Sequence, residues 1–336
     1  MNQKIMIAIK KYEEKPSIIN KQELEDLVLS SNNPAWCYYL VKKVNTQQLE
    51  KYAEIIIKSE DPKYNYLFAK DIKGADILAH GQVVINSKNV YYNTCFAQLE
   101  GADVLSHGKV IINTNNPEWN YQFALKVKNA DVLEHGKIVE KSKDSKLNYA
   151  FAKDIKGADI LSHGKVIIAN DDAEENYKFA LNIKGAAITL HEEVVLKKEN
   201  LFICYKFARD VKGANIQKHS DLIKKSNDLE LILQFAKNVK GADIIELGKI
   251  IINSNNPYYN YAFAKDVPGA DIKAHGQAVI DSKNALWNYQ FAKDIPGADI
   301  ASHEQAIIDS GDINRFIDFE LEVMNQEKQK TIIKKY

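Results

Sequence analysis

The feature that most constrains the fold is an internal repeat, because all eight histidines of the chain occupy one position of a recurring unit. Each histidine lies six residues after a glycine, or after Asn129 in the one unit that lacks the glycine. These positions run from Gly74 to Gly297 and step by 27 residues once and then by 28 residues seven times. Such a period is typical of proteins built from small units that pack only against their neighbours. Fold and function must therefore be analysed one unit at a time.

Two helix starts are visible in each unit. The first is an Asn or Asp in constant phase, and proline follows it at Pro34, Pro62, Pro117 and Pro257, which is typical of the first position of a helix. The second is an Asp or Asn two residues after the glycine, and Glu134 and Glu246 predict capping boxes with Asp131 and Asp243. The first helix is expected to stop at the glycine. The predicted caps of the first helices are Asn33, Asp61, Asn89, Asn116, Asp144, Asp172, Asn200, Asp228, Asn256, Asn284 and Asp312.

The apolar residues of the two helices differ in their spread. On a helical wheel, the first helix has an apolar arc of roughly 100°, and the second has one of roughly 220°, as expected for a helix covered on most sides. The pattern predicts an all-α fold, a right-handed α-solenoid of about ten 28-residue helix-turn-helix repeats with atypical capping ends. Residues 1–32 and 313–336 break the pattern and are predicted to cap the repeat array 33–312.

Composition narrows the classes of partner. The 45 basic and 45 acidic residues cancel, which disfavours binding to nucleic acid or an anionic membrane through net charge alone. Only Arg209 and Arg315 carry the planar guanidinium that recognises bases and phosphates well. No segment approaches the roughly 18 apolar residues of a membrane span. Three scattered cysteines read as free thiols, so we expect a cytoplasmic protein, of the producing cell or of a host.

The histidine row has a functional and a structural interpretation. The functional one is a metal ladder or a pH sensor. Leu247 and Tyr52 occupy the same position in two units, and no Cys or carboxylate recurs nearby as a further ligand, so we favour partly buried side chains bonded to a neighbouring loop or carbonyl. No metal or cofactor is expected. The row comprises His80, His107, His135, His163, His191, His219, His275 and His303.

An asparagine recurs four residues after most first-helix caps. It faces inward on the wheel, so its amide must find partners, and a ladder of amides that bond to adjacent units is predicted. The sharper alternative is a groove in which each unit presents one Asn to a ligand, as helical RNA-binding repeats do. Cys37, Cys204 and Ile232 replace it in three units. The row comprises Asn65, Asn93, Asn120, Asn148, Asn176, Asn260 and Asn288.

Other recurring residues receive structural interpretations. The tyrosine that follows most of these asparagines is predicted to pack between hairpins, with base stacking as the functional alternative. Glycine follows most histidines and predicts the close approach of a neighbouring helix. Lys-Asp pairs such as Lys265-Asp266 predict a solvated face of balanced charge.

The repeat resembles the broad class of helical-hairpin solenoids that includes HEAT-like and tetratricopeptide-like repeats. The resemblance covers roughly residues 17–312 and rests on the paired caps and the hairpin period. The unit is shorter than a tetratricopeptide repeat and lacks its Trp-Leu-Gly-Tyr spacing. Units of the style Phe-Ala-Lys-Asp-Ile-Lys-Gly-Ala-Asp are similar to those of uncharacterised bacterial or viral repeat proteins, and this likeness implies no activity.

The sequence favours a binding scaffold over an enzyme. No nucleophile with a base, no phosphate loop and no metal motif stands out from the repeat, so a non-catalytic chain is expected. We expect it to recognise a protein or peptide along the surface of the superhelix; the alternative is single-stranded nucleic acid held in a groove lined by Lys, Asn and Tyr. Positions that vary on the outer side of the first helix are the predicted partner contacts: Leu67, Gln122, Ala150, Lys178, Lys206, Gln234, Ala262 and Gln290.

Overall fold

The computed structural model describes residues 1–325, and within that range the chain is an all-helical solenoid of 23 α-helices followed by one π-helical turn, with no strand. The predicted fold class is confirmed. The early helices are α1 (Asn2–Glu14), α2 (Ile18–Ser31), α3 (Pro34–Lys43), α4 (Leu49–Lys58), α5 (Pro62–Asp71), α6 (Ile77–Asn86), α7 (Val90–Phe96), α8 (Val104–Ile112), α9 (Pro117–Lys126), α10 (Val132–Lys141), α11 (Ser145–Asp154) and α12 (Ile160–Ala169).

The later helices continue the same alternation, and most of them have ten residues. They are α13 (Ala173–Asn182), α14 (Ile188–Lys197), α15 (Leu201–Asp210), α16 (Ile216–Ser226), α17 (Leu229–Asn238), α18 (Ile244–Asn253), α19 (Pro257–Asp266), α20 (Ile272–Asp281), α21 (Ala285–Asp294), α22 (Ile300–Ser310), α23 (Ile313–Phe319) and the π-helix η1 (Glu320–Met324). No helix in residues 1–325 has the length and apolar character needed to cross a bilayer.

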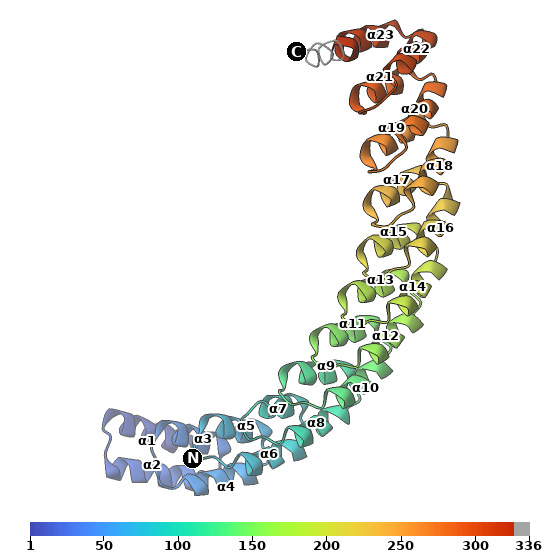
Figure 1. Ribbon diagram of the computed structural model, residues 1–336. Coiled ribbons are helices and arrows are strands. Elements are labelled where there is room, and N and C mark those ends of the chain that lie inside the picture. The colour runs from blue at the N-terminus through green and yellow to red at the C-terminus, as the bar shows by residue number, and fades with distance from the viewer. Residues whose placement is uncertain (326–336) are drawn as a thin grey trace, which may run out of the picture. The chain divides into compact units, whose positions relative to one another are not determined.

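The chain divides into two compact units, Met1–Val166 and Ile167–Tyr336. In each, a helix pairs with the next to form a hairpin, and successive hairpins pack side by side. Figure 1 shows the result within each unit: odd-numbered helices form one row and even-numbered helices a second. The helices α3, α5, α7 and α9 are in contact in sequence, as are α4, α6, α8 and α10. The right-handed sense of the array and the boundaries of its capping ends stay predictions.

The core lies between the two rows. Ten of the eleven first helices have a completely buried phenylalanine three residues after the position of the recurring asparagine, and Leu40 takes this place in α3. A Val or Ile on each second helix of the array, such as Val84 and Ile111, is also completely buried. Eight of these Phe rings pack against the histidine of their own repeat, with ring centroids 4.7 Å apart for Phe123 and His135. The fully buried phenylalanines are Phe68, Phe96, Phe123, Phe151, Phe179, Phe207, Phe235, Phe263, Phe291 and Phe319.

The predicted helix starts are confirmed. All eleven predicted residues are first-helix N-caps, and each side chain accepts a hydrogen bond from a backbone N–H of the first turn, as Asn116 does from Trp119 at 3.0 Å. The capping boxes are only half formed. Asp131 accepts from the Glu134 N–H, but the Glu134 carboxylate binds Lys137 at 2.5 Å instead of returning to the cap.

The ends of the first helices differ from the prediction. They stop about three residues before the glycine, at an apolar C-cap in extended conformation such as Val267 with φ −102°. The glycine then adopts the left-handed conformation inside the turn, and Asn129 does the same with φ 63°. Burial decides this difference, because the C-cap side chain points into the core, Val267 being 3% exposed.

The ends of the second helices also turn through a left-handed residue, which the sequence does not signal. The residue directly before each first-helix cap has positive φ although most are not glycine; Lys88 has φ 54° and Lys283 has φ 52°. Only the last of these positions, Gly311 with φ 75°, is a glycine. An L-residue in this conformation is disfavoured by roughly 1 kcal/mol. Each such junction between repeats therefore holds a small local strain.

We expect Lys88→Gly and Lys283→Gly to stabilise the chain by about 0.5–1 kcal/mol each, because glycine tolerates positive φ and both side chains are exposed. Gly311→Lys is the matched reverse substitution and should destabilise by a similar amount. Urea denaturation of the three variants measures these changes. A loss of stability in both Lys88→Gly and Lys283→Gly would show that the lysine side chains contribute more to stability than the backbone strain removes.

The C-terminal end of the described chain keeps the repeat register beyond residue 312. Asp312 caps α23, and Phe319 and Val323 are buried in the positions that a first helix gives to its core residues. Residues 313–325 thus continue the pattern of a first helix. The rest of the predicted cap, 326–336, lies outside the described residues.

Candidate functional site

The recurring polar residues meet in a buried pair inside each repeat. The asparagine of the first helix and the histidine of the second are both fully buried, and their Oδ1 and Nδ1 atoms lie 2.7 Å apart, as in Asn120 and His135. The Asn120 Nδ2 donates to the backbone oxygen of Asn116 at 2.7 Å and to that of Ile111, on the preceding second helix, at 3.3 Å. One amide therefore joins three elements of two repeats. The pairs are Asn65–His80, Asn93–His107, Asn120–His135, Asn148–His163, Asn176–His191, Asn260–His275 and Asn288–His303.

This geometry fixes the histidine tautomer. Since the asparagine amide nitrogen donates to two carbonyls, its oxygen is the acceptor and the histidine donates from Nδ1–H. The Nε2 atom then carries a lone pair, which has no hydrogen-bond partner in six of these histidines, among them His107 and His135. The prediction was a partly buried histidine bonded to a neighbouring loop or carbonyl. The partner is the side-chain carbonyl of the asparagine in the same repeat, and the histidines are fully rather than partly buried.

The glycine that follows most histidines makes room for the next repeat. A Cβ added at Gly108 would lie 3.3 Å from both the His135 Nε2 and the Phe123 ring, which is tighter than ordinary van der Waals contact. Gly136 faces His163 and Phe151 at the same distances. The close approach predicted from these glycines is confirmed, although side chains of the next repeat rather than its helix backbone come near.

The two members of the pair are lost together in two repeats. Ile232 replaces the asparagine where Leu247 replaces the histidine, and Cys37 stands with Tyr52; all four are buried. The Ile232–Leu247 pair fills the space without leaving a donor unsatisfied, whereas a lone Asn or His would bury one. In the Cys37–Tyr52 pair the buried Tyr52 hydroxyl has no hydrogen-bond partner. The asparagine and the histidine are therefore replaced together, as expected if the hydrogen bond between them has a structural role.

One repeat replaces only half of the pair and finds another partner. Cys204 stands where the asparagine would be, so His219 lacks its usual acceptor. Glu192, which replaces the glycine of the preceding repeat and is 3% exposed, accepts instead from the His219 Nε2 at 3.2 Å and from the Asn215 N–H at 2.5 Å. His219 is therefore the opposite tautomer, with its Nδ1 unpartnered. Burial lowers the pKa of His219, and the Glu192 carboxylate opposes this shift.

We expect Glu192→Gly to destabilise the chain by about 3 kcal/mol, because it leaves the buried His219 and the Asn215 N–H without their acceptor. Adding Cys204→Asn should recover most of that loss, since the asparagine restores the acceptor that the other repeats place 2.7 Å from the histidine. Thermal unfolding of the single and double variants tests this. Equal stability of the two variants would contradict it.

The histidines are poorly suited to bind a ligand. Burial lowers the pKa of seven of them to about 4, so they are neutral at physiological pH. Each is closed off from solvent, and within residues 1–325 no three His, Cys, Asp or Glu side chains are grouped so that they could hold a metal ion. Burial also raises the pKa of Cys37 and Cys204 to about 12, which keeps both thiols protonated and unreactive.

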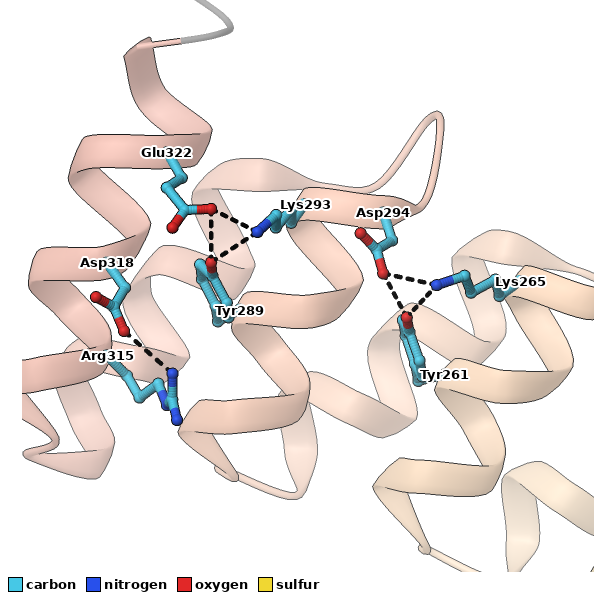
Figure 2. Close-up of polar contacts among 8 residues, drawn as sticks. All are labelled: Tyr261, Lys265, Tyr289, Lys293, Asp294, Arg315, Asp318 and Glu322. Carbon is cyan, nitrogen blue, oxygen red and sulfur yellow. Dashed lines mark hydrogen bonds and ion pairs between the residues drawn. The ribbon is translucent and has the colours of Figure 1, made fainter.

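The tyrosines and the Lys-Asp pairs join neighbouring first helices. Figure 2 shows Lys265 of α19 between the Tyr261 hydroxyl of the same helix and Asp294 of α21, with Nζ distances of 2.6 Å and 2.8 Å. Tyr261 also donates to Asp294. The prediction of a merely solvated charged face is therefore too simple, because lysine and aspartate pair across repeats. The arrangement recurs with Tyr289, Lys293 and Glu322, and with Tyr38, Lys42 and Asp71.

The predicted partner contacts do not form one exposed stripe. Lys178 is exposed, Ala262 is 8% exposed, and the other six are half-buried between first helices. Lys206 lies over the Tyr177 ring at 4.7 Å and pairs with Glu174, so its charge is engaged within the chain. That these residues bind a partner stays a prediction.

An exposed apolar row lies instead on the second helices of the unit Met1–Val166. Leu78, Leu105, Leu133 and Leu161 occupy the same position of four successive repeats, and they are 64%, 58%, 56% and 56% exposed. We call them the leucine row. The sequence pattern did not single them out from the other apolar residues of the second helix. The signal that separates them is their place in the first turn, where the helix begins at the surface.

Three comparisons with known proteins find no counterpart: no family model, no curated protein and no solved structure matches the chain.

Proposed function

We propose that the chain is a non-catalytic scaffold that binds a protein partner along the surface of its repeat array. The observation that carries the proposal is the leucine row, four leucines more than half exposed on successive repeats. Exposed apolar side chains that gather in one place are typical of protein interaction sites.

The recurring polar residues support the same proposal by their placement. The asparagines and histidines face each other inside the repeats, and the tyrosine hydroxyls of Tyr121, Tyr177 and Tyr261 bind carboxylates of the next repeat. A groove that reads single-stranded nucleic acid would need these amides and rings free to contact bases. The protein-binding function is therefore the better supported of the two.

The state of the cysteines is relevant to the cellular compartment in which the protein acts. Cys37, Cys95 and Cys204 are free thiols, and two of them are buried, as is usual in a reducing compartment. We propose that the scaffold acts in the cytoplasm, of the producing cell or of a host.

The test is capture from a lysate of the source by the immobilised chain, with and without nuclease, followed by mass spectrometry. The proposal predicts a specific protein retained at the same level after nuclease. Capture of RNA or DNA, with the proteins lost on nuclease treatment, would favour the nucleic-acid function and contradict the proposal. Binding that falls steeply with salt would point the same way.

A further inference from the structure

We propose that the leucine row docks an amphipathic helix of the partner protein, with an apolar residue at every seventh position and acidic residues along one flank. The inference rests on the proposed function, because it names the partner's chemistry at the same surface. It goes beyond that function by assigning the site to α6, α8, α10 and α12 and by specifying the structure of the bound segment.

The spacing of the leucine row favours a helix as the bound segment of the partner. The second helices α6, α8 and α10 pack directly against one another, and packed helices have axes about 8–10 Å apart. Seven residues of a helix advance about 10.5 Å and bring the side chain back to nearly the same face. An extended strand presents same-face residues at multiples of about 6.6 Å, which fits this step poorly. A helix laid across the row would thus place one apolar residue against each leucine.

The charged residues beside the leucine row favour a bound helix with acidic residues along one side. One turn after three of the leucines come Lys109, Lys137 and Lys165, which are exposed on the same side of their helices. Lys137 pairs with Glu134, whereas Lys109 and Lys165 have no ion pair within residues 1–325. On the other side of the row, Asp103 and its equivalents accept hydrogen bonds from backbone N–H groups of their own helices. The lysine side is therefore the one with charge free to meet carboxylates.

The equivalent positions of the unit Ile167–Tyr336 lack this surface. They are occupied by Thr189, Gln217, Ile245, Lys273 and Ala301, so only Ile245 is a large apolar residue. A second copy of the chain is the less fitting occupant of the row. A stable dimer buries about 800 Å² on each partner, and four partly exposed leucines offer far less apolar surface than that.

The probe is a synthetic helical peptide of about 28 residues with leucine at every seventh position, glutamates on one flank and a fluorescent label. A control peptide has the same composition with its leucines at every fifth position. Fluorescence anisotropy with the full chain should give saturable binding of the first peptide, at least about tenfold tighter than the control. Binding of both peptides with equal affinity, or of neither, overturns the inference.

Chain variants locate the site. Leu105→Lys with Leu133→Lys should weaken peptide binding by at least about tenfold, and Lys109→Glu with Lys165→Glu should weaken it and reduce its dependence on salt. Ile245→Lys, 70% exposed in the other unit, is the matched control and should change nothing. Circular dichroism checks that each variant is folded. An unchanged affinity of the double leucine variant overturns the inference.

Two further measurements distinguish a failure of the proposed helix site from a failure of the proposed function. Sedimentation of the chain alone should show no dimer that Leu105→Lys dissociates, since such a dimer would make a second copy the occupant. If the double leucine variant still captures the nuclease-resistant partner from lysate, the helix site is wrong while the scaffold function stands. If no protein is captured by the unmodified chain, the proposed function itself fails.

Discussion

The free energy of unfolding is expected to fall by about 2 kcal/mol for each Asn–His repeat that unfolds, as the pH is lowered from 7 to 5. Burial holds the pKa of these histidines at about 4 in the folded chain, whereas an unfolded histidine titrates near 6.5. Between these two pKa values only the unfolded state binds the proton, so each histidine stabilises the fold above pH 6.5 and loses that contribution as the pH falls. The loss from pH 7 to pH 5 is about 2 kcal/mol per histidine.

The physical cause is the position of the unprotonated nitrogen. A proton on Nε2 of His135 would be a charge in the core, next to Gly108 and the Phe123 ring rather than an acceptor. His163 has the Glu140 carboxylate 3.8 Å from Nε2, yet burial still keeps its pKa at about 4. Acid therefore acts on the interior of the array before most surface carboxylates are protonated.

Urea denaturation at pH 7, 6 and 5 measures the effect, and hydrogen exchange shows which repeats open first. The chain supplies its own control. The double variant Asn120→Ile and His135→Leu copies the Ile232–Leu247 pair, so it should lose about 2 kcal/mol less than the unmodified chain over the same pH range. A denaturation midpoint that does not change from pH 7 to pH 5 would contradict the assignment of neutral, buried histidines.

The second large effect is expected when one member of a pair is replaced alone. Asn120→Ile should cost about 2–3 kcal/mol at pH 7, because the His135 Nδ1–H loses its acceptor in a fully buried place. His135→Leu alone strands the Asn120 oxygen and should cost a similar amount. The double variant should cost much less than the sum, with a coupling of about 2 kcal/mol between the two positions.

A double-mutant cycle from denaturation curves at pH 7 tests this coupling. The natural pair Ile232–Leu247 shows that the repeat accommodates an apolar replacement of both residues. Costs that simply add would mean that the Asn120–His135 hydrogen bond contributes little and that packing alone explains the buried positions.

Much of the fold could be predicted from the sequence because its signals are local. Asn116 before Pro117 marks a helix start by itself, since a capping side chain and a proline need only the first turn to act. Asn129 in place of glycine pointed to a left-handed residue, and its φ is 63°. Repetition then multiplied each local signal along the chain.

The candidate site was less predictable because it depends on contacts between repeats. Glu192 of one repeat binds His219 of the next because the two repeats pack together. Nothing in the sequence of either repeat alone indicates this pair. The left-handed Lys88 carries no signal at all, because its conformation is imposed by the junction that follows α6. The leucine row carried no separate sequence signal, since Leu105 and its partly buried neighbour Val104 differ only in where the helix meets the surface.

The central claim is that the Asn–His pairs hold the repeats together while the leucine row binds the partner. The most direct measurement is the amount of nuclease-resistant partner captured by two folded variants beside the unmodified chain: Asn120→Ile with His135→Leu, and Leu105→Lys with Leu133→Lys. We expect full capture by the first variant and loss of capture by the second. Capture lost in the first and retained in the second would contradict this expectation and favour the asparagines and histidines as the ligand-binding residues.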